Sequence, residues 1–195
     1  MRVAATSLAN GWIRFCGISA LLAVGCALHT EAGGAGSAGT ADDPPVVNSM
    51  KDPAPTNLGV LKAELPALPS SWKLQRIKKT GTHVEAEWHS PTERTLVGVV
   101  YIHVPPFMPK GALVKSVKEH YVKDQPGGKI TKQWADSAGR NWFEVEGSVS
   151  YCKGYVVART GKAWFAYYQY LKDQPKESEE ISQAEKMIEE VRPMD

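Results

Sequence analysis

The segment His83–His89 carries histidine, glutamate, glutamate and histidine at alternate positions, which is the most pointed chemical pattern in the sequence. In a strand, alternate side chains leave the same face about 7 Å apart. If the next turn centres near Glu93, the hairpin places His103 across from His83. Two imidazoles and a carboxylate can bind zinc or a similar divalent ion, so His83, Glu85 and His103 are candidate metal ligands. The alternative is a solvated sheet face that binds nothing.

Cys152 is a second candidate, because a thiol beside an imidazole from His103 or His120 could act as a nucleophile. The sequence around it carries no serine, cysteine or glycine-rich catalytic signature. A lone cysteine in a strand-like stretch usually packs as a small buried residue. The sequence therefore predicts no catalytic activity and no cofactor, and ranks an enzyme using Cys152 last among the alternatives.

Aromatic residues of the second half could line a site for an apolar or sugar ligand, or fill the core. Aromatic side chains in strands usually pack in the core, so we expect most of them there. The residues in question are Trp134, Trp142, Trp164, Tyr167, Tyr168 and Tyr170.

The charge balance argues against a nucleic-acid partner, which requires a concentrated basic surface. The chain has 23 Lys and Arg against 21 Asp and Glu, and two of the basic residues, Arg2 and Arg14, fall in the first 25 residues. The charge is nevertheless unevenly distributed, because lysines are frequent before residue 133 and the C-terminal segment is acidic. This asymmetry could orient the domain toward an anionic membrane or an acidic partner, or the lysines could simply form a solvated face. These lysines are Lys73, Lys78, Lys79, Lys110, Lys115, Lys118, Lys123, Lys129 and Lys132.

A basic start followed by a short apolar run predicts a secretory signal peptide over residues 1–25. The run is too short to span a bilayer as a helix. It ends in Leu22–Cys26, which resembles the lipobox of bacterial lipoproteins. Gly25 and Cys26 match that motif, whereas Ala23 stands where the family usually has leucine. The resemblance implies acylation of Cys26 and a membrane anchor; the alternative is ordinary cleavage nearby.

Residues 26–57 are predicted to be a tether. Ala32–Gly39 is rich in glycine, and Asp42–Pro45 and Asp52–Pro55 are rich in proline and polar. Such segments bury too little apolar surface to fold. With Cys16 lost in the leader and Cys26 acylated, the third cysteine has no partner for a disulfide, and the count excludes a cysteine-rich zinc site.

Residues 58–195 are predicted to form one globular domain around the segment Ala163–Leu171. This segment is apolar on both faces, so it reads as the middle strand of a sheet. Helices are expected after Pro109 and after Pro175, the latter with a buried stripe of Ile181, Ala184, Ile188 and Val191 and an end at Pro193. The other strands are predicted at 72–75, 83–89, 95–104, 130–134, 142–151 and 155–160.

This order of elements predicts an α+β fold, an antiparallel β-sheet covered by helices. The Leu68–Trp72 start, the helix after Pro109, the Trp142–Leu171 meander and the acidic terminal helix resemble the PsbP-like superfamily. That group includes an extrinsic subunit of photosystem II, a Ran-binding nuclear import factor and many small bacterial exported proteins. The resemblance spans residues 58–193. It implies an α/β/α sandwich and a binding or assembly role without shared catalytic residues.

The combined expectation is an exported module on the periplasmic or extracytoplasmic side of a cell envelope. A lipid anchor at Cys26 would hold it to the membrane, and a protein partner is expected. The alternative is a small-molecule or metal carrier of the envelope.

Overall fold

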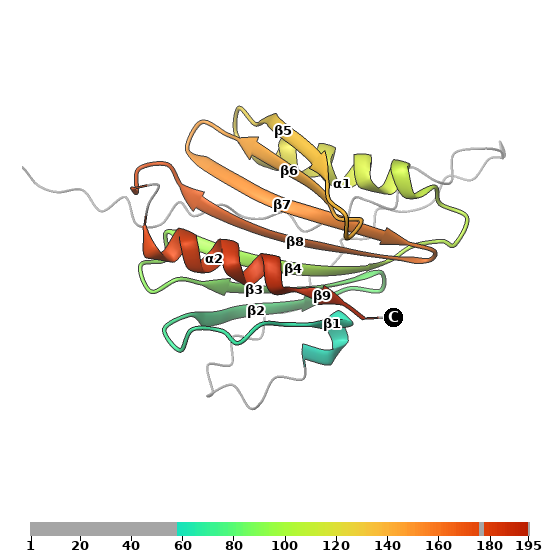
Figure 1. Cartoon of the computed structure of the whole chain (residues 1–195), viewed down its shortest axis with the longest axis horizontal. Helices are drawn as coiled ribbons and strands as arrows, with labels where there is room; N and C mark the ends of the chain where they lie inside the picture. Colours follow the sequence, from blue (N-terminus) through green and yellow to red (C-terminus); the bar gives the residue numbers. More distant parts are fainter. Residues whose placement is uncertain (1–57, 176–177, 195) are drawn as a thin grey trace, which may run out of the picture.

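A seven-stranded antiparallel sheet forms the middle layer of the protein, which the computed structural model describes for residues 58–175 and 178–194 (Figure 1). The strand order is β2-β3-β4-β8-β7-β6-β5. The strands are β2 (Lys73–Lys79), β3 (His83–His89), β4 (Thr95–His103), β5 (Lys129–Ala135), β6 (Asn141–Glu146), β7 (Ser150–Arg159) and β8 (Lys162–Leu171).

Strand β8 occupies the centre of this sheet, as its two-sided apolar pattern predicts. Trp164, Ala166 and Tyr168 lie in the core of one face, and Phe165 and Tyr167 in the core of the other. All five side chains are buried, because both faces of the sheet are covered at its middle strand.

One helix covers each face of the sheet, which confirms the predicted α+β fold with its α/β/α layers (Figure 1). Helix α1 (Lys110–Asp124) packs on β6 and β7 through Leu113, Val117 and Tyr121. Helix α2 (Glu179–Glu190) packs on β4 and β8 on the other face. Among the described residues, no helix is long and apolar enough to span a bilayer.

Helix α2 has the predicted buried stripe, to which the structure adds Met187. The Ser178 side chain caps its start by accepting a hydrogen bond from the Ile181 amide. The predicted end at Pro193 is wrong, because the helix ends at Glu190 and Arg192–Pro193 form β9, which pairs with β1 (Ala63–Glu64).

The predicted single strand over residues 142–151 is wrong as well. Strand β6 ends at Glu146, and the Gly147 amide donates to the Ser150 carbonyl to close a turn into β7. Val149 sits in this turn with 53% of its surface exposed. Glycine and serine at 147–148 suit a turn better than a continuous strand.

The elements define two ends of the molecule, which matter for function (Figure 1). One end, on the right, gathers the 3-10 helix η2 (Leu58–Leu61), the β2–β3 turn, the loop from β4 to α1 and the β7–β8 turn. The other end gathers the β3–β4 turn and the connection from β8 to α2. The described chain both starts and finishes near the first end, which we call the η2 end.

Candidate functional site

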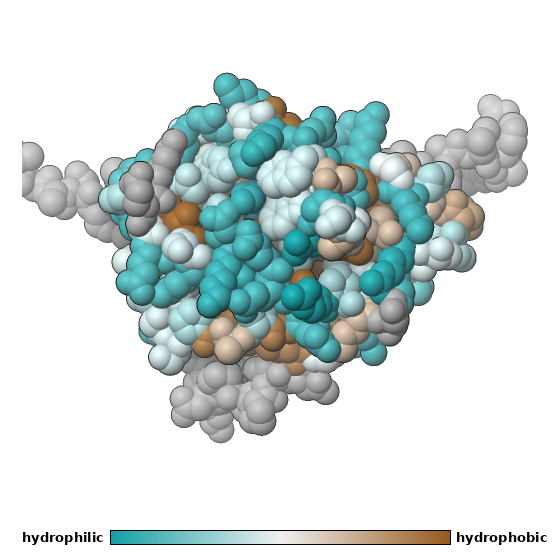
Figure 2. Space-filling view, in the orientation of Figure 1, coloured by the Kyte–Doolittle hydropathy of each residue, from teal (hydrophilic) through white to brown (hydrophobic). Residues whose placement is uncertain are grey.

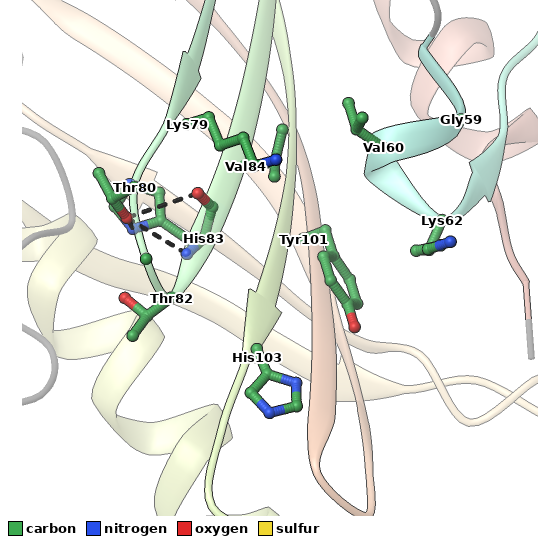
Figure 3. Close-up of a pocket in the computed structure, with 11 residues that line it drawn as sticks. Gly59, Val60, Lys62, Lys79, Thr80, Thr82, His83, Val84, Tyr101 and His103 are labelled. Atoms are coloured by element: carbon green, nitrogen blue, oxygen red, sulfur yellow. Dashed lines mark hydrogen bonds between the residues drawn. The ribbon is translucent and has the colours of Figure 1, made fainter.

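A pocket of about 560 Å³ opens at the η2 end, between η2 and the ends of β3 and β4 (Figure 3). Its size falls in the range of small-molecule sites. The residues that line it are Gly59, Val60, Lys62, Lys79, Thr80, Gly81, Thr82, His83, Val84, Tyr101 and His103.

Trp164 fixes the η2 wall of this pocket to the sheet. Its indole Nε1 donates to the backbone carbonyls of Leu61, at 3.1 Å, and Lys62, at 2.9 Å. Tyr101, on the neighbouring strand β4, packs against the same indole with ring centroids 5.5 Å apart. A buried indole N–H needs an acceptor, so this contact holds the first described residues against the central strand.

The β2–β3 turn forms the opposite wall. The Thr80 amide donates to the His83 carbonyl at 2.8 Å, and Thr80 Oγ1 lies 2.7 Å from His83 Nδ1. The His103 amide donates to the Thr82 carbonyl at 2.7 Å, which joins this turn to the end of β4. The turn is therefore held by hydrogen bonds before any ligand arrives.

The chemistry of the lining favours an anionic ligand. Lys62, Lys79 and His103 are exposed at the pocket, and none of its described lining residues is acidic. His83 is buried, and burial together with the charge of Lys78 holds the pKa of its imidazole below 6.5. The ring is thus neutral at pH 7, and its Nε2 has no hydrogen-bond partner among the described residues.

The structure does not bring together the candidate metal ligands His83, Glu85 and His103. His83 lies opposite Ile102, one residue short of His103, so the two histidines leave opposite faces of the sheet. No group of three or more His, Cys, Asp or Glu side chains in the described part of the chain is arranged to hold a metal ion.

The alternative of a solvated polar face on β3 is wrong too, because Glu85 and Glu87 are buried. Their charges are compensated inside the protein. Arg76 Nη2 lies 3.4 Å from Glu85 and 2.9 Å from Glu87, and His89 Nε2 lies 2.8 Å from Glu87. A buried carboxylate needs such partners, so these residues form a structural charge cluster.

Cys152 lies in the core with no exposed surface, and the side-chain hydrogen bond that affects its thiol is with Tyr121, not with His103 or His120. Burial raises the pKa of its thiol well above the usual range, although the Tyr121 hydrogen bond acts against that rise. His120 instead lies 3.3 Å from Asp124 on its own helix. The thiolate that a nucleophile requires is disfavoured here.

The aromatic residues belong mostly to the core, as predicted. Trp142, Trp164, Tyr167, Tyr168 and Tyr170 are buried. Trp134, on the edge strand β5, is half-buried and stacks on Trp142, with ring centroids 5.7 Å apart. Figure 2 shows pale side chains of intermediate hydropathy near this half of the sheet, between hydrophilic ones.

Sequence reasoning missed Lys62, Thr80 and Tyr101, which line the pocket. Lys62 has a positive φ of 50°, a conformation that a sequence pattern does not reveal.

Three predictions lie outside the described residues. They are the signal peptide over residues 1–25, the tether over residues 26–57 and the lipidation site at Cys26.

Comparisons with known proteins add little beyond the fold. No protein-family model and no curated protein matches the sequence. The structure is similar to that of LpqN, described as involved in cell envelope biogenesis of Mycobacterium tuberculosis, at 11% identity and a TM-score of 0.40, covering 68% of this chain and 83% of that one. It is also similar to a Bacteroides thetaiotaomicron protein at 10% identity and a TM-score of 0.38, covering 69% of this chain and 46% of that one. Similarity at this level indicates no function.

Proposed function

We propose that the protein is a lipid-anchored binding module of a bacterial cell envelope, without catalytic activity. The observation that carries the proposal is that the first described residues of the domain line the pocket. Gly59, Val60 and Lys62, which directly follow the predicted tether, form one wall of that pocket. An anchor at Cys26 would thus hold the pocket close to the membrane, on the extracytoplasmic side.

The absence of catalysis is supported by the state of Cys152. Its burial and the upward shift of its pKa oppose nucleophilic chemistry at neutral pH. The PsbP-like resemblance in the order of elements also favours a binding or assembly role. We therefore expect the module to act by recognising a protein partner at the membrane.

Two measurements test this function. Cys26→Ala should move the mature protein from the membrane fraction to the soluble fraction, whereas retention in the membrane would contradict acylation at this position. Native mass spectrometry of protein gently extracted from its own envelope should show the added mass of another polypeptide. A chain that carries lipid alone would contradict the adaptor role.

A small-molecule carrier is the second candidate, and the composition of the pocket favours it. Ammonium, imidazole and hydroxyl groups are among those that line it, and these groups suit a carboxylate or phosphate ligand. The same mass spectrum would then show a small added mass that Lys62→Ala removes. The exposed Lys123 is the control, because Lys123→Ala lies on α1, away from the pocket, and should keep the added mass.

A further inference from the structure

We propose that the η2 end of the domain docks on the surface of an anionic lipid bilayer, with Phe107 as its apolar anchor. The orientation rests on the proposed lipid anchor, whereas the docking surface itself rests on the exposed side chains at this end.

Phe107 is the most exposed large hydrophobic residue among those described, with 85% of its surface accessible. It lies at the tip of a tight turn between β4 and α1, closed by a 3.0 Å hydrogen bond from the Met108 amide to the Pro105 carbonyl. Figure 2 shows hydrophobic side chains projecting at this end. An aromatic ring held out on a proline-stiffened turn suits the interface between lipid headgroups and acyl chains.

Basic side chains lie on the other segments of the η2 end and at the start of α1. Lys62, Lys79 and Lys110 are exposed, and Lys162 is half-buried at the β7–β8 turn. These segments lie side by side: the Val104 amide donates to the Gly161 carbonyl at 3.0 Å, and β4 joins the β2–β3 turn through His103. Lysines close to an anionic bilayer gain electrostatic attraction, which adds to the insertion of an apolar ring.

Two of the described acidic residues at this end have a basic residue beside them. Glu64 lies across from Arg192 in the β1–β9 pair. Lys186 lies 3.9 Å from Glu190 at the end of α2, where Glu189 is also exposed.

The opposite end carries charges of both signs. Asp173 is paired there with Arg94, and Lys172 with Glu146. Its most exposed large hydrophobic residue is Val149, with 53% of its surface accessible, compared with 85% for Phe107. The exposed aromatic ring therefore distinguishes the η2 end.

The start of the described chain supports the same orientation. Leu58, at the η2 end, directly follows the predicted tether of residues 26–57. A chain of that length has a root-mean-square span of roughly 30 Å if it behaves as a flexible coil. The tether therefore allows the η2 end to rest on the membrane that the anchor enters.

The test is the depth of a nitroxide label on the full acylated chain in vesicles. Phe107→Cys supplies one labelling position, and the exposed Val149→Cys, at the β6–β7 turn, is the matched control. Cys152 is fully buried and does not compete for the label. In vesicles that contain phosphatidylglycerol, the label at 107 should collide at least several-fold more with dissolved oxygen than with an aqueous relaxation reagent. The label at 149 should remain aqueous.

Charge reversal completes the test. Lys62→Glu with Lys110→Glu should return the label at 107 to the aqueous phase, whereas Lys123→Glu, on the distal end of α1, should not. Equal aqueous exposure of both labels on retained protein would overturn the docking proposal. Protein that is not retained by the vesicles would contradict the Cys26 anchor instead, so the two failures are distinguishable.

Discussion

The hydroxyl of Tyr167, on the central strand β8, donates a 3.3 Å hydrogen bond to Glu85 Oε1 on β3, across the intervening strand β4. The bond spans β4 because Gly98 has no side chain at the crossing point. Arg76 approaches the same carboxylate from β2. The polar row on β3 is therefore an internal part of the fold, supported from both neighbouring sides.

Gly98→Ala should destabilise the protein by about 1–3 kcal/mol, because overpacked core positions typically cost this much. A Cβ at position 98 would lie 2.3 Å from the ring of Tyr167, which is itself fully packed. Urea unfolding measures the change. Gly111→Ala is the control: nothing lies within 4 Å of its Cβ, so its stability should stay the same or rise slightly. Equal stability of both variants would contradict the close packing at Gly98.

Glu85→Gln should change how stability depends on pH. Burial raises the pKa of Glu85 above 4.5, against the opposing charge of Arg76. The folded carboxyl thus holds its proton more tightly than the unfolded one, and the wild type loses stability as pH rises from about 4.5 through the folded pKa. The glutamine of the variant does not titrate, so the variant does not lose this stability. The free energy of unfolding of the variant should therefore rise relative to that of the wild type as pH increases across that window.

Glu87→Gln should behave with the opposite sign. Burial acts to raise the pKa of Glu87, but the hydrogen bond from His89 and the charge of Arg76 outweigh burial and hold it below 4.5. This carboxylate stabilises the fold above pH 4.5, and the contribution is lost as pH falls through the folded pKa. The wild type should exceed the variant above pH 4.5, and the gap should close in acid. Parallel curves for the two glutamine variants would contradict these assignments.

Ser178→Ala should cost about 1 kcal/mol, the usual effect of removing a helix N-cap. The side chain accepts a hydrogen bond from the Ile181 amide at 3.3 Å, at the start of α2. Thermal or urea unfolding should show the loss. Ser182 is exposed inside the same helix, so Ser182→Ala should leave stability unchanged or raise it slightly. A neutral Ser178→Ala would mean that the cap contributes nothing.

Cys152 should resist a thiol reagent at neutral pH in the folded protein and react fully in denaturant. The thiol has no exposed surface, and its raised pKa keeps it protonated. Mass spectrometry after brief exposure to a maleimide gives the modified fraction. Rapid modification of the folded chain would revive the interpretation of Cys152 as a nucleophile.

The position of β8 and the buried stripe of α2 were predictable, because both follow from local hydrophobic patterns. The partners of His83 were not. The β3–β4 turn centres between Thr92 and Glu93, since Ser90 bonds to Thr95, and this half-residue difference from the expected centre moves His103 to the other face.

The burial of Glu85 was equally hidden from the sequence. Its partners Arg76 and Tyr167 come from β2 and β8, strands that only the sheet order brings to either side of it. The pocket depends in the same way on η2 reaching Trp164, a contact between residues 102 or 103 positions apart. Such long-range pairings leave no local pattern.

The proposed lipid anchor is tested by the intact mass of the protein isolated from its native membrane, with peptide mapping of its N-terminus. We expect a mature chain that begins at Cys26, with added mass on that residue matching lipid. A mature chain that begins elsewhere, or an unmodified Cys26, would contradict the lipid-anchored envelope module.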